Sequence, residues 1–190
     1  REFGSGGREL GRRLAQELNF AYYDQEIISE ISKRTSLSEQ YVQAIVERRP
    51  SFSFPIHIGQ SFYALGNPAF EQTMTVYQEQ ARIITEMAAK SDCVIVGRCA
   101  DYVLQEKKNC HRVFIYAPFD YRVQTVIRRL DRNETSAKRL VKKMDKERRY
   151  YYEYFTDRKW MDMNHYDLCI DSSKFSETAI LDILEALYLK

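Results

Sequence analysis

The sequence has little net charge and no long apolar run. Its 190 residues carry a formal charge of only +2, which argues against a protein that binds nucleic acid by bulk electrostatics. No stretch approaches the ~18 apolar residues of a membrane span, and no secretory signal pattern is visible. We therefore expect neither a nucleic-acid partner nor a membrane segment.

Cysteines are few, and none of them form a pair. The four are Cys93, Cys99, Cys110 and Cys169, with no CxxC spacing and no disulfide framework. Cys93 and Cys169 lie in apolar runs and are predicted to be buried free thiols. Free thiols are typical of a reducing compartment, so we expect a cytoplasmic protein, and no residue is assigned to a metal.

The composition is that of a folded domain. Hydrophobic residues make up 44% and charged residues 29% of the chain, which is enough for a core and ordinary for a soluble protein. The length predicts a single domain over 1–190, with room for a small mobile subdomain.

A glycine-rich turn opens the chain and runs straight into a helix. Leu10, Leu14, Ala15 and Leu18 share one helical face. Glycines allow positive φ and close approach of a ligand, and a helix N-terminus offers free N–H groups to an anion. The residues predicted to bind phosphate are Gly4, Ser5, Gly6, Gly7, Arg8 and Glu9. The alternative is an ordinary flexible turn or a linker scar.

This loop departs from the common phosphate-loop pattern G-x-x-x-x-G-K-[ST]. Aligned by its glycines, it has Gly7 in the place of the lysine and Glu9 in the place of the hydroxyl residue, which leaves Arg8 as the cation at hand. A buried strand should also precede such a loop, so we expect a first strand outside the given residues.

Beyond the loop, short apolar runs alternate with helical patterns. Strands are predicted over 20–24, 92–98, 111–117 and 166–170, and helices over 24–34, 36–49, 69–90, 100–104, 120–130 and 176–189. Such alternation predicts a parallel sheet, in which ligands bind at the carboxyl ends of the strands. The glycine loop, Asp24, Arg98 and Asp101 all fall at these ends.

Two helices carry a predicted inward face that the structure can test. The predicted face of 69–90 holds Phe70, Met74, Tyr77, Ala81, Ile84 and Met87, and that of 176–189 holds Ile180, Ile183, Leu184 and Leu187. Residues 50–68 combine prolines, glycines and aromatics. They predict an ordered segment, either a lid over a pocket or a pinned surface loop, and His57 within it is read as structural.

Basic residues concentrate in 128–159, which holds twelve Lys or Arg and six Asp or Glu. Arginine suits a phosphate clamp because its fork binds two oxygens, so Arg148, Arg149 and Arg158 are predicted to act on a transferred phosphoryl group. Arg148 and Arg158 share a face only if the helix continues between them. The lysines instead indicate a solvated face with pairs such as Asp145–Arg149.

Taken together, these stretches resemble the cytidylate kinase-like family, a divergent branch of the P-loop nucleoside monophosphate kinases. The matching segments are R-E-F-G-S-G-G-R-E-L-G at 1–11, Y-Y-D-Q-E at 22–26, C-V-I-V-G-R-C-A-D-Y-V-L at 93–104, D-K-E-R at 145–148, Y-Y at 151–152 and Y-D-L-C-I at 166–170. The resemblance implies a three-layer α/β/α P-loop NTPase fold with a five-stranded parallel sheet. It also implies a helical monophosphate-binding part within 30–90 and a lid within 130–160.

The resemblance also implies roles for single residues. Asp24 matches the aspartate that opens the monophosphate-binding helices, and Gly97-Arg98 matches a pair that holds the acceptor nucleotide. Cys99 stands where cytidylate kinases have an aspartate, with Asp101 two positions on, and Val96 replaces a metal-orienting carboxylate. Asp24, Arg98 and Asp101 are therefore predicted to bind the acceptor.

Three functions follow as hypotheses. The first is an ATP- and Mg²⁺-dependent kinase acting on a CMP- or dCMP-like nucleoside monophosphate, with Arg8, Arg148, Arg149 and Arg158 as catalytic groups. The second is an inactive nucleotide sensor, which the missing lysine and hydroxyl favour. The third is a structural protein in which 150–155 forms a partner interface, and this leaves a homodimer open.

Overall fold

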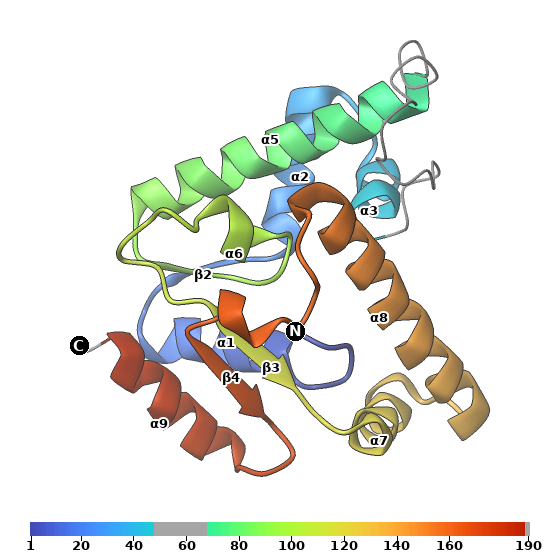
Figure 1. Ribbon diagram of the computed structural model, residues 1–190, viewed down its shortest axis with the longest axis vertical. Helices are drawn as coiled ribbons and strands as arrows, with labels where there is room; N and C mark the ends of the chain where they lie inside the picture. Colours follow the sequence, from blue (N-terminus) through green and yellow to red (C-terminus); the bar gives the residue numbers. More distant parts are fainter. Residues whose placement is uncertain (48–67, 189–190) are drawn as a thin grey trace.

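The computed structural model describes residues 1–47 and 68–188 as an arrangement of helices around two small parallel sheets (Figure 1). The strands are β1 (Ala21–Tyr23), β2 (Cys93–Ile95), β3 (Val113–Tyr116) and β4 (Leu168–Asp171). The helices are α1 (Gly7–Glu17), α2 (Gln25–Thr35), α3 (Glu39–Glu47), α5 (Pro68–Lys90), α6 (Ala100–Val103), α7 (Phe119–Leu130), α8 (Glu134–Thr156) and α9 (Glu177–Tyr188), with a 3₁₀ turn η1 at Met163–His165. The order of elements matches the predicted alternation. His57 and most of the segment predicted to cover a pocket lie outside the described residues.

The strands form two parallel pairs. β1 pairs with β2, with Ala21 opposite Cys93, and β3 pairs with β4, with Val113 opposite Leu168. Parallel pairing confirms the α/β class, because parallel neighbours require helical crossovers. The described residues do not form the single five-stranded sheet that was expected, since β2 and β3 are not hydrogen-bonded to each other.

A cavity of about 1270 Å³ extends between the two pairs. Val94 and Val96 at β2, Val113 and Ile115 on β3, and Leu10 of α1 are among the residues that line it. The chain begins at this place: the N–H of Glu2 donates to the carbonyl of Ile115 at 3.1 Å, and Figure 1 shows the N-terminus beside β3. The edge of β3 that faces the cavity is thus paired only at this point among the described residues.

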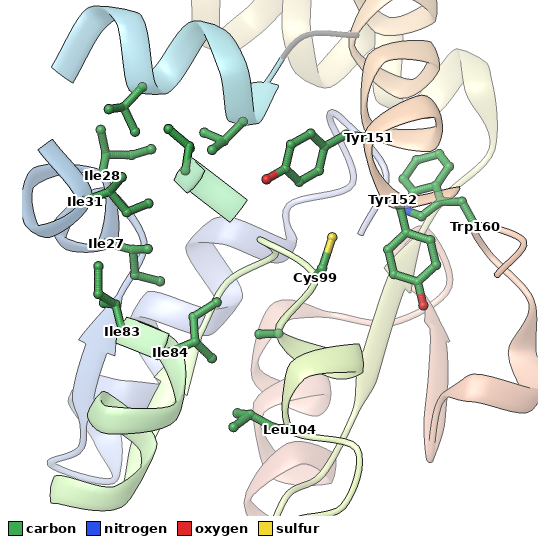
Figure 2. Close-up of a cluster of buried hydrophobic side chains, with 14 of the residues drawn as sticks. Ile27, Ile28, Ile31, Ile83, Ile84, Cys99, Leu104, Tyr151, Tyr152 and Trp160 are labelled. Atoms are coloured by element: carbon green, nitrogen blue, oxygen red, sulfur yellow. The ribbon is translucent and has the colours of Figure 1, made fainter. Parts of the chain in front are cut away.

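The largest buried cluster lies among α2, α3, α5, α6 and α8. Figure 2 shows Ile27, Ile28 and Ile31 of α2 facing Ile83 and Ile84 of α5. Each fully buried isoleucine contributes roughly 1.5–3 kcal/mol relative to an exposed one. A second cluster joins α1 and α9 to β3 and β4. These two clusters fix the helices on which the site is built.

The predicted inward faces were partly wrong. On α5 the buried side chains are Thr73, Val76, Gln80, Ile83 and Ile84, so of the predicted face only Ile84 is fully buried. The pattern failed because a polar residue, Gln80, occupies the centre of the buried face. On α9, Leu181 is buried, whereas Ile183 is 37% exposed.

Cysteine burial also differs from the prediction. Cys99 is the buried thiol, whereas Cys93 and Cys169 are only half-buried, and all four are free. The apolar runs around Cys93 and Cys169 form strands that border the cavity or a partly covered sheet face. Among the described residues, no helix combines the length and the apolar character that crossing a bilayer would require.

The basic region 128–159 is not one helix. α7 ends at Leu130 with Asp131 in a left-handed conformation (φ 47°). The side chain of Asn133 then caps α8 by accepting a hydrogen bond from the N–H of Ser136 at 2.9 Å. α8 runs along one side of the molecule from α7 to α3 (Figure 1).

Candidate functional site

The glycine loop is held rigidly from within. Gly4 and Gly6 have φ of 84° and 82°, which only glycine adopts without strain. The hydroxyl of Ser5 is buried and lies 2.9 Å from the carbonyl of Glu2 and 3.1 Å from that of Ile115. Ser172 in turn donates to the carbonyl of Ser5 at 2.7 Å. The loop can therefore offer its backbone N–H groups to an anion, but the Ser5 hydroxyl is already engaged.

A buried arginine on α7 anchors the loop to its surroundings. Arg122 donates to the carbonyls of Ala117 at 2.9 Å and Phe3 at 3.1 Å, and to Asp145 Oδ2 at 2.5 Å. A carboxylate oxygen of Glu2 lies 3.2 Å from its Nε. The sequence reading missed Arg122. The available signal was its spacing of four from Val126, which places a charge on the apolar stripe of α7.

Glu9 and Arg8 point to different neighbours. Glu9 forms an ion pair of 2.5 Å with Arg129 on α7, beside a hollow of about 320 Å³ lined by Gly4, Ser5 and Gly6. Arg8 forms an ion pair of 2.5 Å with Asp24, whose side chain is 5% exposed. Arg8 is thus engaged with the acidic residue that follows β1.

The turn after β2 is strained and braced. Gly97, Arg98 and Cys99 have φ of 77°, 59° and 55°, and left-handed conformations of non-glycine residues cost free energy that functional sites often store. The buried side-chain amide of Gln80 donates to the carbonyl of Arg98 at 2.9 Å. The hydroxyl of Tyr151 lies 3.4 Å from Gln80 Oε1. α5 and α8 therefore hold this turn in place, and Figure 2 shows Cys99 and Tyr151 facing the same interior space.

Asp101 on α6 is tied to α8. The hydroxyl of Tyr152 donates to Asp101 Oδ2 at 2.7 Å. Burial raises the pKa of Tyr152, and the neighbouring Asp101 carboxylate raises it further. The phenol therefore stays protonated as a donor, and it fixes the carboxylate at the cavity wall.

The three arginines predicted for the lid lie in three different environments. Arg148 is half-buried, donates to the carbonyl of Arg1 at 3.4 Å and lies 5.3 Å from the ring centre of Phe3. Arg149 is exposed. α8 ends at Thr156, so Arg158 does not share a face with Arg148. Its guanidinium instead binds Gln105 and lies 4.9 Å from the ring centre of Tyr102, which docks the end of α8 on α6.

Asp145 also differs from its predicted role. It was expected to pair with Arg149 on a solvated face, but its carboxylate receives the N–H of Phe3 at 2.8 Å as well as Arg122. Asp145 bonds to Phe3 and Arg122 because the N–H of Phe3 needs a nearby acceptor, which the Asp145 carboxylate provides.

The cavity brings together four of the predicted site residues, Gly7, Arg98, Asp101 and Arg148, whereas Gly4, Ser5 and Gly6 line the smaller hollow. Polar and aromatic groups from the loop, α6, α8 and the strand ends line the cavity wall: Arg1, Arg98, Asp101, Arg148, Tyr151, Tyr152 and Tyr166. Asp24 and Arg8 do not line this cavity, but their charges act on the guanidinium of Arg1. Guanidinium groups outnumber carboxylates here, so the wall favours an anion. Among the described residues, no three Asp, Glu, His or Cys side chains come together as a metal site.

Comparison with known proteins identifies relatives of the whole chain. The sequence profile of the cytidylate kinase-like family matches residues 1–174. A cytidylate kinase of Methanosarcina barkeri is 26% identical over 96% of this chain and 89% of its own length, and one of Methanopyrus kandleri is 23% identical over 96% and 87%. A crystal structure of an uncharacterized protein from Eubacterium ventriosum superposes with a TM-score of 0.72 at 26% identity, covering 99% of this chain and 94% of that one.

Proposed function

The chain belongs to the cytidylate kinase-like family, and from this premise we propose that it transfers a phosphoryl group from ATP to a nucleoside monophosphate of the CMP or dCMP type, or to a related small acceptor. The observation that carries the proposal is that Arg98 and Arg148 line the same cavity as Gly7, the first residue of α1. Phosphoryl transfer is mostly positioning and charge neutralisation, which such a cavity wall supplies.

The donor phosphates would bind at the start of α1. The free N–H groups of Gly6, Gly7 and Arg8 and the helix dipole favour a polyphosphate there. Mg²⁺ keeps several waters and is usually held by substrate phosphates with few protein carboxylates. Since the described residues form no metal site of their own, we assign Mg²⁺ to the nucleotide that carries it.

The acceptor would bind at the strand ends. Arg98 would bind its phosphate in a bidentate fork, and Asp24 and Asp101 would hold the rest of the nucleotide by hydrogen bonds. Arg148 would approach the group in transfer from α8, with Arg149 as the less favourably placed neighbour. No general base is required, because a phosphate acceptor is already ionised at neutral pH.

The same proposal assigns the parts of the fold. α2, α3 and α5 would form the monophosphate-binding part within 30–90, and α8 the lid within 130–160, all in one domain. The cavity between β2 and β3 would take the fifth strand of a parallel sheet. Its walls support this assignment, because Val94 of β2 and Ile115 of β3 both line the cavity, and each of these strands belongs to a parallel pair.

A coupled assay with MgATP and CMP, dCMP, UMP or AMP tests the activity. We expect turnover, with CMP or dCMP preferred. Arg98→Gln should raise the KM for the acceptor at least tenfold, because a charged hydrogen-bond partner is worth about 1.5–3 kcal/mol. Arg82→Gln, at an exposed site on α5, serves as the control. No turnover with any acceptor, at protein concentrations that reveal a slow rate, would refute the proposal.

A specific observation favours the sensor as the second candidate. The side chains of Ser5, Arg8 and Glu9 are all engaged with protein groups, so the loop presents no free hydroxyl or cation of its own. A sensor would bind nucleotide tightly without turnover and without dependence on Mg²⁺. Calorimetric titration with ATP, in the presence and absence of Mg²⁺, separates the two candidates.

A further inference from the structure

The side chain of Arg1 lies against the first residue of α1 and lines the same cavity as Arg98 and Asp101. Its Cβ and Cδ lie 3.2 Å from the point where a Cβ on Gly7 would stand, so its stem passes the first residue of α1. The charges that act on its guanidinium include those of Asp24, Arg98 and Arg8. The side chain therefore lies beside the start of α1, assigned to the donor phosphates, in the cavity that the acceptor group Arg98 also lines.

The Nε of Arg1 is buried, and no described residue accepts a hydrogen bond from it. Asp24, the carboxylate that attracts Arg1, already forms an ion pair with Arg8. Burial lowers the pKa of the Arg1 guanidinium, and the charges of Arg98 and Arg8 act in the same direction. A buried charge that lacks a full partner is costly, and each such group in a native protein calls for an explanation.

We infer that Arg1 is a phosphate ligand, which supplies the cation that the glycine loop lacks and binds the phosphoryl group that lies between donor and acceptor. The inference rests on the proposed function for the identity of the ligand as a nucleoside triphosphate. Its chemical core, a polyphosphate anion bound by Arg1, stands on the geometry alone. The hydrogen bond from Arg148 to the carbonyl of Arg1 fixes the backbone from which the side chain extends.

A purely structural role makes the opposite prediction about stability. If Arg1 served packing alone, its replacement would lower the melting temperature. If it is kept for an absent anion, an apolar side chain of similar length should stabilise the ligand-free protein, because an uncompensated charge leaves the interior. The sign of the change therefore separates the two roles without any assay of activity.

The experiment compares Arg1→Met and Arg1→Lys with Arg12→Met, a control at an exposed position of α1. Pyrophosphate and tripolyphosphate are the probes, in calorimetric titration and thermal melts. For Arg1→Met we expect an unchanged or higher melting temperature without ligand, at least tenfold weaker probe binding and a smaller thermal shift. Arg1→Lys should regain part of the binding, and Arg12→Met should match the parent.

Activity gives an independent readout. If the parent turns over, Arg1→Met should lower kcat about 10³-fold, as for other arginines that stabilise the transferred group. If the parent binds tripolyphosphate but never turns over, the proposed kinase fails while the Arg1 inference survives. The inference is overturned if the parent binds neither probe, if Arg1→Met binds both as tightly as the parent, or if Arg1→Met melts lower than the parent.

Discussion

Asp145 on α8 and Arg122 on α7 form a partly buried ion pair of 2.5 Å, and both side chains also bind Phe3 at the start of the glycine loop. One carboxylate thus connects the helix assigned as the lid to the loop assigned to the donor. Any tilt of α8 about this point must move the loop backbone or break the pair.

Asp145→Asn should therefore destabilise the protein. It removes one charge of a partly buried pair and leaves Arg122 with Glu2 as its remaining carboxylate, so we expect a loss of about 3 kcal/mol in the free energy of unfolding. Urea denaturation measures it. Glu147→Gln, on the same helix with a lysine 4.0 Å away, should cost less than about 1 kcal/mol. Equal losses for the two variants would show that the anchor contributes little.

The two left-handed glycines of the loop should respond differently to alanine. A Cβ on Gly4 would lie 2.8 Å from the backbone oxygen of Arg122, whereas a Cβ on Gly6 would meet nothing within 4 Å. Gly6→Ala should lower the free energy of unfolding by about 1 kcal/mol, from backbone strain alone. Gly4→Ala should lower it clearly more and should also weaken the binding of tripolyphosphate. Thermal melts and calorimetry check both. A Gly4→Ala protein as stable as Gly6→Ala would contradict the close approach.

Much of the fold was predictable from local patterns. Helix α2 was predicted from Ile27, Ile28 and Ile31, because this spacing places three aliphatic side chains on the same face of a helix. The inward face of α5 was not predictable, because the buried Gln80 amide finds its partners in the Arg98 carbonyl and the Tyr151 hydroxyl. Such a bond forms only when folding brings two distant segments together, and the apolar periodicity of the helix does not predict it.

Gln80→Leu tests that bond. The variant leaves the buried carbonyl of Arg98 without its partner, so we expect a loss of about 1–3 kcal/mol in stability. The relaxed turn should also raise the KM for the acceptor more than it changes kcat. Gln78→Leu, at an exposed position of the same helix, is the control. A variant with unchanged stability and KM would show that the turn holds its shape without Gln80.

The Arg112–Asp167 pair should make the free energy of unfolding depend on pH in the acidic range. Hydrogen bonds from Arg112 lower the pKa of Asp167, despite an opposing effect of burial. A lowered folded-state pKa stabilises the fold above the unfolded pKa of about 3.9 and stops doing so as pH falls through the folded value. Asp167→Asn should cost up to about 1 kcal/mol at pH 7, since the pair is partly exposed.

The cost of Asp167→Asn should shrink as the pH falls below about 4 and vanish once the parent carboxyl is protonated in both states. Denaturation across this pH range measures the difference. Asp182→Asn, exposed on α9, should show no such convergence. A difference for Asp167→Asn that stays constant down to pH 2 would mean that its effect is not electrostatic.

A strand placed ahead of Arg1 should stabilise the protein. We expect a fusion of about six apolar, β-branched residues to raise the melting temperature by burying side chains between β2 and β3. A polar fusion of equal length is the control, and equal melting temperatures for both fusions would argue against a strand-shaped slot.

The site was less predictable than the fold, for a physical reason. That Asp24 and Arg98 follow two neighbouring strands was predictable, because β1 and β2 pair in parallel and their carboxyl ends meet at one edge; their role as acceptor ligands stays a prediction. Arg122 and Arg1 were not found, since an arginine reads the same in sequence whether it anchors a backbone, binds an anion or faces water. Only its acceptors distinguish these cases, and the acceptors here are mostly main-chain carbonyls from distant segments.

The left-handed turn after β2 also contains a thiol whose reactivity can report local opening of the protein. Cys99 closes that turn, and burial raises the pKa of its thiol far above the ordinary value. A buried, protonated thiol does not react with an alkylating reagent until the surrounding helices separate. The rate at which Cys99 is alkylated therefore measures how often the helices around the cavity separate. A ligand that holds these helices together should slow alkylation in proportion to its occupancy.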